Sequence, residues 1–194
     1  CHYHLDTCRE DEFAHSVCFQ PHIVYLANSS ALKIGITRIV NMPTRWLDQG
    51  ATQALPILKV GSRRLSGHLE TLIGTQIADK TDWRKLLKGE AEPLNLIEQR
   101  DQILEEFAPK IQTIRDEFSQ NLEFDENLEF LENELPREFI YPVEQYPEKI
   151  KSLNLDKTPK IRGVLQGIKG QYLLLDIGVI NIRKYTGYEL ILRA

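Results

Sequence analysis

The sequence contains no long apolar run. None of its apolar stretches approaches the ~18 consecutive residues that a membrane-spanning helix requires. It also lacks a basic and then apolar leader of the kind that directs secretion. We therefore expect no membrane partner and a cytoplasmic protein. The chain has 194 residues and 42% of them are hydrophobic, which is enough to bury a core in one large domain or two small ones.

Cysteine is scarce and confined to one end of the chain. All three cysteines lie within the first 18 residues, and four of the five histidines lie within the first 22. Three cysteines do not make the disulfide framework of a small secreted domain. Thiolate and imidazole ligands suit tetrahedral Zn²⁺, so Cys1, Cys8, Cys18 and His22 would complete a closed structural site. We predict that residues 1–21 form a Cys/His-rich zinc-binding segment, with reduced free thiols or a split site as the alternative.

The sequence opens on Cys1, inside this cluster and not on a methionine. We therefore expect that the segment is truncated and that further residues precede it.

The net charge of −4 is unevenly distributed along the chain. Residues 22–90 carry ten basic and five acidic side chains, residues 91–148 carry four and sixteen, and residues 149–194 carry nine and three. The basic side chains of the first of these segments would bind a polyanion if they shared a face, or they form an ordinary solvated surface. Those concerned are Lys33, Arg38, Arg45, Lys59, Arg63 and Arg64. The pI near 5.8 argues against a broad nucleic-acid surface.

Residues 22–90 have the pattern of a small α/β domain. Apolar runs at 23–27 and 31–36 flank Asn28-Ser29-Ser30, which favours a turn, so we predict a β-hairpin whose second strand ends at Gly35. A third strand is expected at 54–60, and Pro56 would place it at the edge of the sheet.

Two helices are expected around this hairpin. Pro43 suits the first turn of a short helix, which then carries Arg45. Apolar residues at helical spacing predict a second helix at 63–78, with Glu70 on the shoulder of the apolar stripe, where it can face the hairpin.

Residues 91–138 are expected to form a connector. Apolar residues recur every seven positions from Ile97 to Phe118, which predicts a long helix at 93–118 that Pro109 kinks or divides. Its apolar seam packs either on the chain's own core or on a second copy in a coiled coil. The glutamate-rich residues 121–138 indicate an acidic helix or a linker.

Residues 139–194 read as a β-rich unit. Short strands are expected at 139–143, 160–166, 172–177, 179–183 and 189–192, forming an antiparallel sheet or a small barrel. This unit either contributes phosphate contacts and aromatic stacking surfaces or simply covers the first domain. The side chains concerned are Lys160, Arg162, Lys169, Tyr172, Arg183, Lys184, Tyr185 and Tyr188.

The order of four features resembles the GIY-YIG nuclease superfamily. Tyr25 lies on the first predicted strand, Lys33-Ile34-Gly35 on the second, Arg45 ten residues beyond Gly35, and Glu70 on a later helix. The pattern is most similar to the phage-type variant, which also reads Lys-Ile-Gly and carries an acid-Trp pair like Asp82-Trp83. The whole chain resembles a prokaryotic family of unknown function that joins a cysteine-rich segment, a GIY-YIG-like domain and a C-terminal β segment.

The sequence departs from the superfamily pattern at two positions. Lys33 replaces the tyrosine of the second motif, and the first motif reads Ile23-Val24-Tyr25. The predicted fold class is α+β: a small antiparallel sheet flanked by helices, followed by a long helix and a C-terminal β-rich unit.

The resemblance implies a metal-dependent nuclease or a nuclease-like DNA-processing protein that acts on phosphodiester bonds. Glu70 would hold Mg²⁺ or Mn²⁺, Arg45 would bind the phosphate, and Tyr25 would position or deprotonate the water, while Lys33 would contact phosphate. Nucleic-acid binding would further involve the basic residues Arg38, Arg63 and Arg64. The alternative is a catalytically silent, zinc-containing module that binds nucleic acid or a partner on the same fold.

Overall fold

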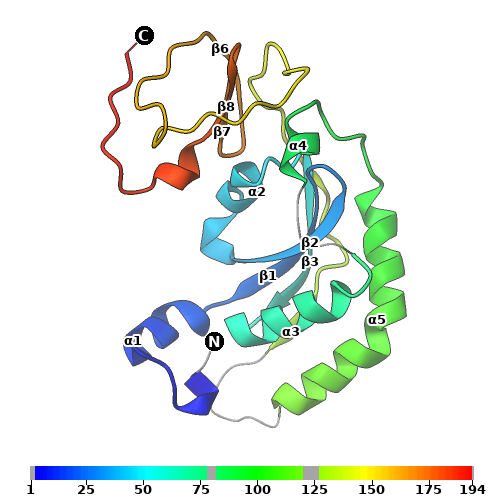
Figure 1. Ribbon diagram of the computed structural model, residues 1–194. Coiled ribbons are helices and arrows are strands. Elements are labelled where there is room, and N and C mark those ends of the chain that lie inside the picture. The colour runs from blue at the N-terminus through cyan, green and yellow to red at the C-terminus, as the bar shows by residue number, and fades with distance from the viewer. Residues whose placement is uncertain (1–2, 78–81, 120–126, 194) are drawn as a thin grey trace.

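The computed structural model describes residues 3–77, 82–119 and 127–193, which form two antiparallel sheets and several helices (Figure 1). The first sheet has the strand order β2-β1-β3-β4, and β5 also pairs with β3. Its strands are β1 (His22–Asn28), β2 (Leu32–Arg38), β3 (Gln53–Val60), β4 (Leu128–Phe130) and β5 (Arg137–Glu138). The predicted α+β class, with antiparallel sheets, a long helix and C-terminal strands, is confirmed.

The predicted hairpin is present as β1 and β2. The two strands pair antiparallel across the Asn28-Ser29-Ser30 turn, and Tyr25 lies opposite Gly35. β2 continues to Arg38 and so extends three residues past the expected end at Gly35. This extension carries Arg38 along the same edge of the sheet as Lys33.

Strand β3 is central, so its predicted edge position is wrong. It pairs with β1 on one side and with β4 and β5 on the other. β5 pairs only with Gln53 and Ala54, and β4 only with residues 58–60, so Pro56 falls in the gap between them. The β1–β3 register shifts at Val24 and Tyr25, and Tyr25 is the partner of Pro56. A proline is tolerated here because neither neighbour needs its missing N–H.

The expectation of an acidic helix or linker at 121–138 is wrong for the part of that segment that the structure describes. β4 and β5 extend the first sheet, and residues 121–126 lie outside the described residues. Leu128 packs into the main core and Leu131 against the opposite face of the sheet.

Helices α3 (Arg63–Ile73) and α5 (Leu96–Ser119) cover one face of the first sheet (Figure 1). Leu65 and Leu69 of α3 and Phe107 and Ile111 of α5 are almost fully buried in this core. The seam of α5 therefore packs on the chain's own core. α5 is not divided at Pro109, although its axis bends in Figure 1. α3 ends at Ile73, before the predicted residue 78, and Gly74 caps it.

The short helix α2 (Thr44–Asp48) lies against the other face of the sheet and carries Arg45, as predicted. Its Trp46 is fully buried, and its ring packs edge-on against that of Tyr25 at a centroid distance of 5.7 Å. This contact holds α2 beside the hairpin.

The N-terminal segment consists of short helical turns joined by irregular stretches. Helix α1 (Asp11–Phe13) runs directly into a π-helical turn (Ala14–Cys18) that leads to β1. None of the helices in the described ranges is both long and apolar enough to cross a membrane.

The C-terminal unit is a three-stranded sheet of β6 (Leu165–Lys169), β7 (Tyr172–Leu175) and β8 (Gly178–Asn181). The strands predicted at 139–143 and 189–192 are absent, apart from a single bridge between Val143 and Gly167. The predicted strand at 160–166 begins only at Leu165. Of the two predicted forms, the sheet is therefore found and the barrel is not.

Candidate functional site

The contact between Tyr25 and Gly35 shapes the edge of the first sheet. Tyr25 is fully buried, and a Cβ built on Gly35 would lie 2.7 Å from both Cζ and Oη of Tyr25. The ring therefore lies across the edge strand β2, in the space that the missing side chain leaves. Only glycine at position 35 lets the hydroxyl group of a tyrosine on β1 reach this edge.

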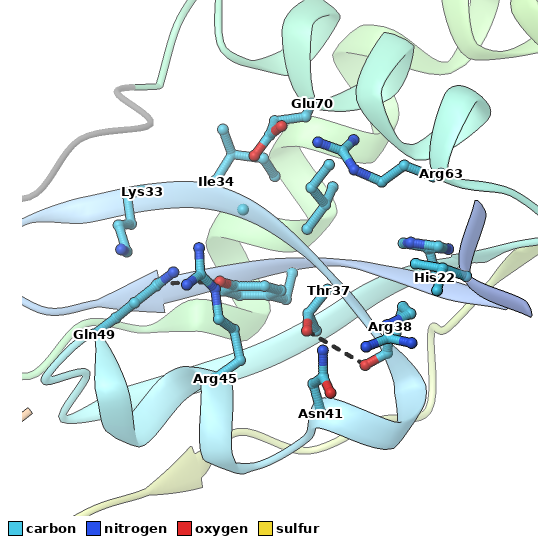
Figure 2. A pocket seen from close by; sticks show the side chains of 14 residues that line it. His22, Lys33, Ile34, Thr37, Arg38, Asn41, Arg45, Gln49, Arg63 and Glu70 are labelled. Atoms are coloured by element: carbon cyan, nitrogen blue, oxygen red, sulfur yellow. Dashed lines mark hydrogen bonds between the residues drawn. The ribbon is translucent and has the colours of Figure 1, made fainter. Parts of the chain in front are cut away.

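A pocket of about 380 Å³ lies over this edge. Side chains of β2 alternate between the two faces of the sheet, so Lys33 and Thr37 share the face of Gly35, and Ile34 and Ile36 point to the other. Figure 2 shows Glu70 and Arg63 of α3 on one side of β2, and Arg45 and Gln49 on the other. The pocket therefore joins both faces of the sheet around its edge strand.

The structure brings together all four residues that the sequence predicts as catalytic. Tyr25, Lys33, Arg45 and Glu70 line this pocket, although 45 positions separate the first from the last. Lys33 lies on the edge strand β2 and is 5% exposed.

The predicted nucleic-acid-binding residues divide into two sets. Arg38 and Arg63 line the pocket together with Lys33 and Arg45. Arg64 does not line it, and its guanidinium group lies 4.7 Å from the ring centroid of Phe118 on α5. Arg63 and Arg64 face different surroundings because successive helix residues point about 100° apart.

Lys59 also lies outside the pocket and forms a salt bridge of 3.1 Å with Glu129 on β4.

Tyr25 is neutral at physiological pH. Burial raises the pKa of its hydroxyl group, and the charge of Glu70 raises it further, whereas Arg45 and the hydrogen bond with Gln49 lower it in part. The hydroxyl donates a hydrogen bond of 3.0 Å to Oε1 of Gln49. Tyr25 therefore enters the pocket as a hydrogen-bond donor.

His22 lies at the other end of the pocket and is also uncharged. It is 2% exposed, and its Nδ1 is 2.6 Å from the carbonyl oxygen of Gln20. Because a carbonyl only accepts, Nδ1 carries the proton. Burial lowers the pKa of His22, and the charges of Arg63 and Arg38 lower it further against the effect of the Gln20 carbonyl.

The pocket is positively charged. Among the residues that the structure describes, Lys33, Arg38, Arg45 and Arg63 line it, against the single carboxylate of Glu70. In the parts of the chain that the structure describes, the three arginines form no salt bridge. A concave site with this balance attracts an anion, and guanidinium groups match the geometry of phosphate oxygens.

The donor set suits a magnesium or manganese ion. Mg²⁺ retains several water ligands and is commonly held by one or two carboxylates together with a phosphate of the substrate. Glu70 supplies one carboxylate to the lining of this cationic pocket.

The zinc prediction remains untested. Cys8 and Cys18 are free thiols, and Cys1 lies outside the described residues. Cys8, Cys18 and His22 do not come together, since no cluster of three metal-binding side chains occurs among the residues that the structure places. His22 instead lines the cationic pocket.

The Asp82-Trp83 pair has structural roles. The carboxylate of Asp82 accepts hydrogen bonds from the backbone N–H groups of Arg84 and Lys85, at 2.9 and 3.2 Å, and so caps α4 (Trp83–Leu86). The ring of Trp83 stacks on that of Tyr172 in the second sheet, with a centroid distance of 6.1 Å.

Sequence reasoning missed Gln49 and the place of His22 in the pocket. Gln49 follows Arg45 by four residues, a spacing that places two side chains on the same side of a helix, so the signal was present. His22 immediately precedes the first apolar run and was assigned to zinc because it lies close to the cysteines in sequence.

These observations define an α+β protein with a cationic pocket at a sheet edge. Residues 1–190 match the family described as "Protein of unknown function (DUF2797)", and the chain belongs to this family. The prediction of a family of unknown function is thereby confirmed. No curated protein and no solved structure matches the chain.

Proposed function

We propose that the protein is a metal-dependent nuclease, or a nuclease-like DNA-processing protein, that acts on phosphodiester bonds in the pocket over β2. The observation that carries this proposal is the convergence of Tyr25, Lys33, Arg45 and Glu70 around Gly35. These are the residues that resemble the GIY-YIG superfamily, and the resemblance supports the same chemistry.

Each side chain has a role that its surroundings support. Arg45 and Lys33 would bind the phosphate and offset the negative charge that develops on it. Tyr25, whose raised pKa keeps it protonated, would donate a hydrogen bond that orients the attacking water or a phosphate oxygen. Glu70 would hold Mg²⁺ or Mn²⁺, and such an ion supplies charge stabilisation and an activated water when bound.

The second candidate is a catalytically silent module that binds nucleic acid or a partner on the same fold. Two observations favour it. Lys33 stands where the superfamily has a tyrosine, and the hydroxyl of Tyr25 is already engaged by Gln49. Either candidate would use the same cationic pocket to bind phosphate.

A cleavage assay separates the two candidates. Labelled single- and double-stranded DNA and RNA are incubated with the protein in Mg²⁺, in Mn²⁺ and in EDTA. Metal-dependent cleavage supports the nuclease. Binding without cleavage in any metal, together with a loss of affinity in Arg45→Ala but not in Arg115→Ala, would establish the silent module instead. Arg115 is an exposed arginine of α5 outside the pocket and matches the change in charge.

Structural zinc at the N-terminal end of the chain, bound by Cys1, Cys8, Cys18 and His22, remains part of the proposal. The test is metal analysis of reduced, untagged protein that includes any residues preceding Cys1. One zinc per chain, lost in Cys18→Ser, supports the site, and folded protein without zinc refutes it.

A further inference from the structure

The cationic side chains of the pocket form two groups along β2. Lys33 and Arg45 lie around Tyr25, close to Gly35, whereas Arg38 and Arg63 lie toward the C-terminal end of β2 (Figure 2). Electrostatic effects divide the residues in the same way. Arg45 and Glu70 act on the pKa of Tyr25, while Arg38 and Arg63 act on that of His22.

The two groups lie at different positions along β2. Lys33 and Arg38 are five positions apart, which corresponds to about 17 Å along a strand. The pocket volume of about 380 Å³ is also larger than the volume that ten water molecules occupy in liquid water, at about 30 Å³ each. A phosphate bound at Arg45 and Lys33 therefore leaves the end near Arg38 unfilled.

The surroundings of Arg38 and Arg63 favour an anion. Both guanidinium groups act on the same neutral histidine, and neither forms a salt bridge within the described ranges. Two like charges held near one another repel, and an anion between them removes that cost. Thr37 and Asn41 line the same end of the pocket and add no negative charge. Glu70 lies beside Arg63 on α3 (Figure 2), but the two form no salt bridge in the described ranges.

We propose that Arg38 and Arg63 bind a second phosphate group of the ligand. This phosphate is the neighbour, along β2, of the phosphate held by Arg45 and Lys33. This inference rests on the proposed function, since it takes the ligand of the pocket to be a phosphodiester. The substrate is then a nucleic-acid strand held through two consecutive phosphates. Such contacts fix the register of the strand without reading its bases.

The test compares thymidine dinucleotides that carry one or two phosphates. TpT has only the internal phosphate, whereas pTpT and TpTp add one at the 5′ or the 3′ end. Affinities are measured in EDTA, to prevent cleavage, from the displacement of a fluorescein-labelled thymidine octamer. We expect the better of pTpT and TpTp to bind wild-type protein about tenfold more tightly than TpT, since a charge-assisted contact is lost from TpT.

Variants test whether Arg38 and Arg63 cause the tighter binding of the two-phosphate dinucleotides. Arg38→Ala and Arg63→Ala should each reduce it to about twofold while leaving the affinity for TpT unchanged. Arg45→Ala should weaken all three dinucleotides and preserve the ratio, and Arg115→Ala should change nothing. Arg38→Gln and Arg63→Gln, which keep a polar side chain without the positive charge, should repeat the alanine result, and thermal melting verifies that each variant is folded. The salt dependence of octamer binding should fall by about 0.7 in slope for each arginine removed.

The outcomes separate this inference from the proposed function. Equal affinity of wild-type protein for all three dinucleotides would overturn the second subsite, even if the protein cleaves the octamer with Mg²⁺. The same holds if the Arg38 and Arg63 variants lose affinity for TpT as much as for the two-phosphate probes. The expected ratios in a protein that cleaves nothing would support the subsite and reject the nuclease. Failure of the octamer and of every dinucleotide to bind would overturn both.

Discussion

The two sheets of this protein use their basic side chains differently. At the edge of the first sheet, Lys33, Arg38, Arg45 and Arg63 line one pocket. In the second sheet, Lys169 is fully buried and donates hydrogen bonds to the carbonyl oxygen of Gly89, at 2.8 Å, and to the hydroxyl of Tyr146, at 3.3 Å. It therefore joins strand β6 to the segments before and after α5 and offers no charge to a ligand.

The tyrosines of the second unit are used in the same structural way. Tyr172 and Tyr185 are buried, and the hydroxyl of Tyr185 accepts a hydrogen bond from the backbone of Leu155. Tyr188 is exposed, but it donates a hydrogen bond to Asp156.

The difference between the sheets shows what turns basic residues into a site. In the first sheet, an edge strand with a glycine and two elements on opposite faces bring the charges together. In the second unit, the buried Lys169 and the tyrosines fix the unit in place. The other basic side chains predicted to contact phosphate are exposed and do not line the pocket over β2; these are Lys160, Arg162, Arg183 and Lys184.

The largest effect should come from Glu70. If the first sheet is catalytic, Glu70→Gln should reduce Mg²⁺-dependent cleavage by at least about 100-fold, because it removes the carboxylate that would hold the ion. Binding measured in EDTA should change little, since the phosphate contacts remain. Glu105→Gln, an exposed carboxylate of α5, is the matched control. Cleavage that survives in Glu70→Gln would place any activity outside this pocket.

A smaller effect, on stability, should follow from filling the space at Gly35. A Cβ there would lie 2.7 Å from the ring and the hydroxyl of Tyr25, so Gly35→Ala should lower the free energy of unfolding by about 1–3 kcal/mol. Gly89→Ala is the control, because a Cβ at Gly89 meets no atom within 4 Å. Both are measured by urea denaturation. In the Tyr25→Ala background, Gly35→Ala should cost less, and an unchanged cost would disprove the contact.

Periodic patterns predicted the parts of the fold that are long or local. The hairpin of β1 and β2 has a clear turn, and α5 has a seven-residue repeat that continues through Pro109. β4 and β5 were missed because strands of three and two residues have little local signal and exist only through their pairing with β3. Residues 189–192 show the opposite case, in which β-forming residues find no partner strand.

The order of its residues in the sequence predicted the candidate site, but only the structure shows which neighbouring residues belong to it. Tyr25, Arg45 and Glu70 follow a recognisable order, but only the packed structure shows that Arg63 lines the pocket and Arg64 contacts Phe118. Lys169 could not be separated by sequence from the exposed Lys184, since burial depends on the contacts of β6 with distant segments.

The smallest effect is expected in the second sheet and concerns the pH dependence of stability. Burial lowers the pKa of Lys169 below its ordinary value of 10.5, although Glu90 opposes this shift. Between the lowered pKa and 10.5, the unfolded chain binds more protons at this position than the folded chain does. Raising the pH through that window therefore stabilises the fold, by about 1.4 kcal/mol for each unit that separates the two pKa values.

Lys169→Met removes the titrating group and keeps an unbranched side chain. The difference in free energy of unfolding between wild type and this variant should therefore shift in favour of wild type from about pH 7 to about pH 10. Groups away from Lys169 titrate alike in both proteins and cancel from the difference. Tyr146 accepts a hydrogen bond from Lys169, but burial raises its pKa from 10.0, so it titrates above this range. Urea denaturation across this range measures the shift, and Lys184→Met, at an exposed position, should show none. Cleavage should be unaffected in both variants, because neither lysine lines the pocket over β2. A flat difference for Lys169→Met would mean that the buried amine keeps its ordinary pKa, and a loss of cleavage would show that the second sheet takes part in the site.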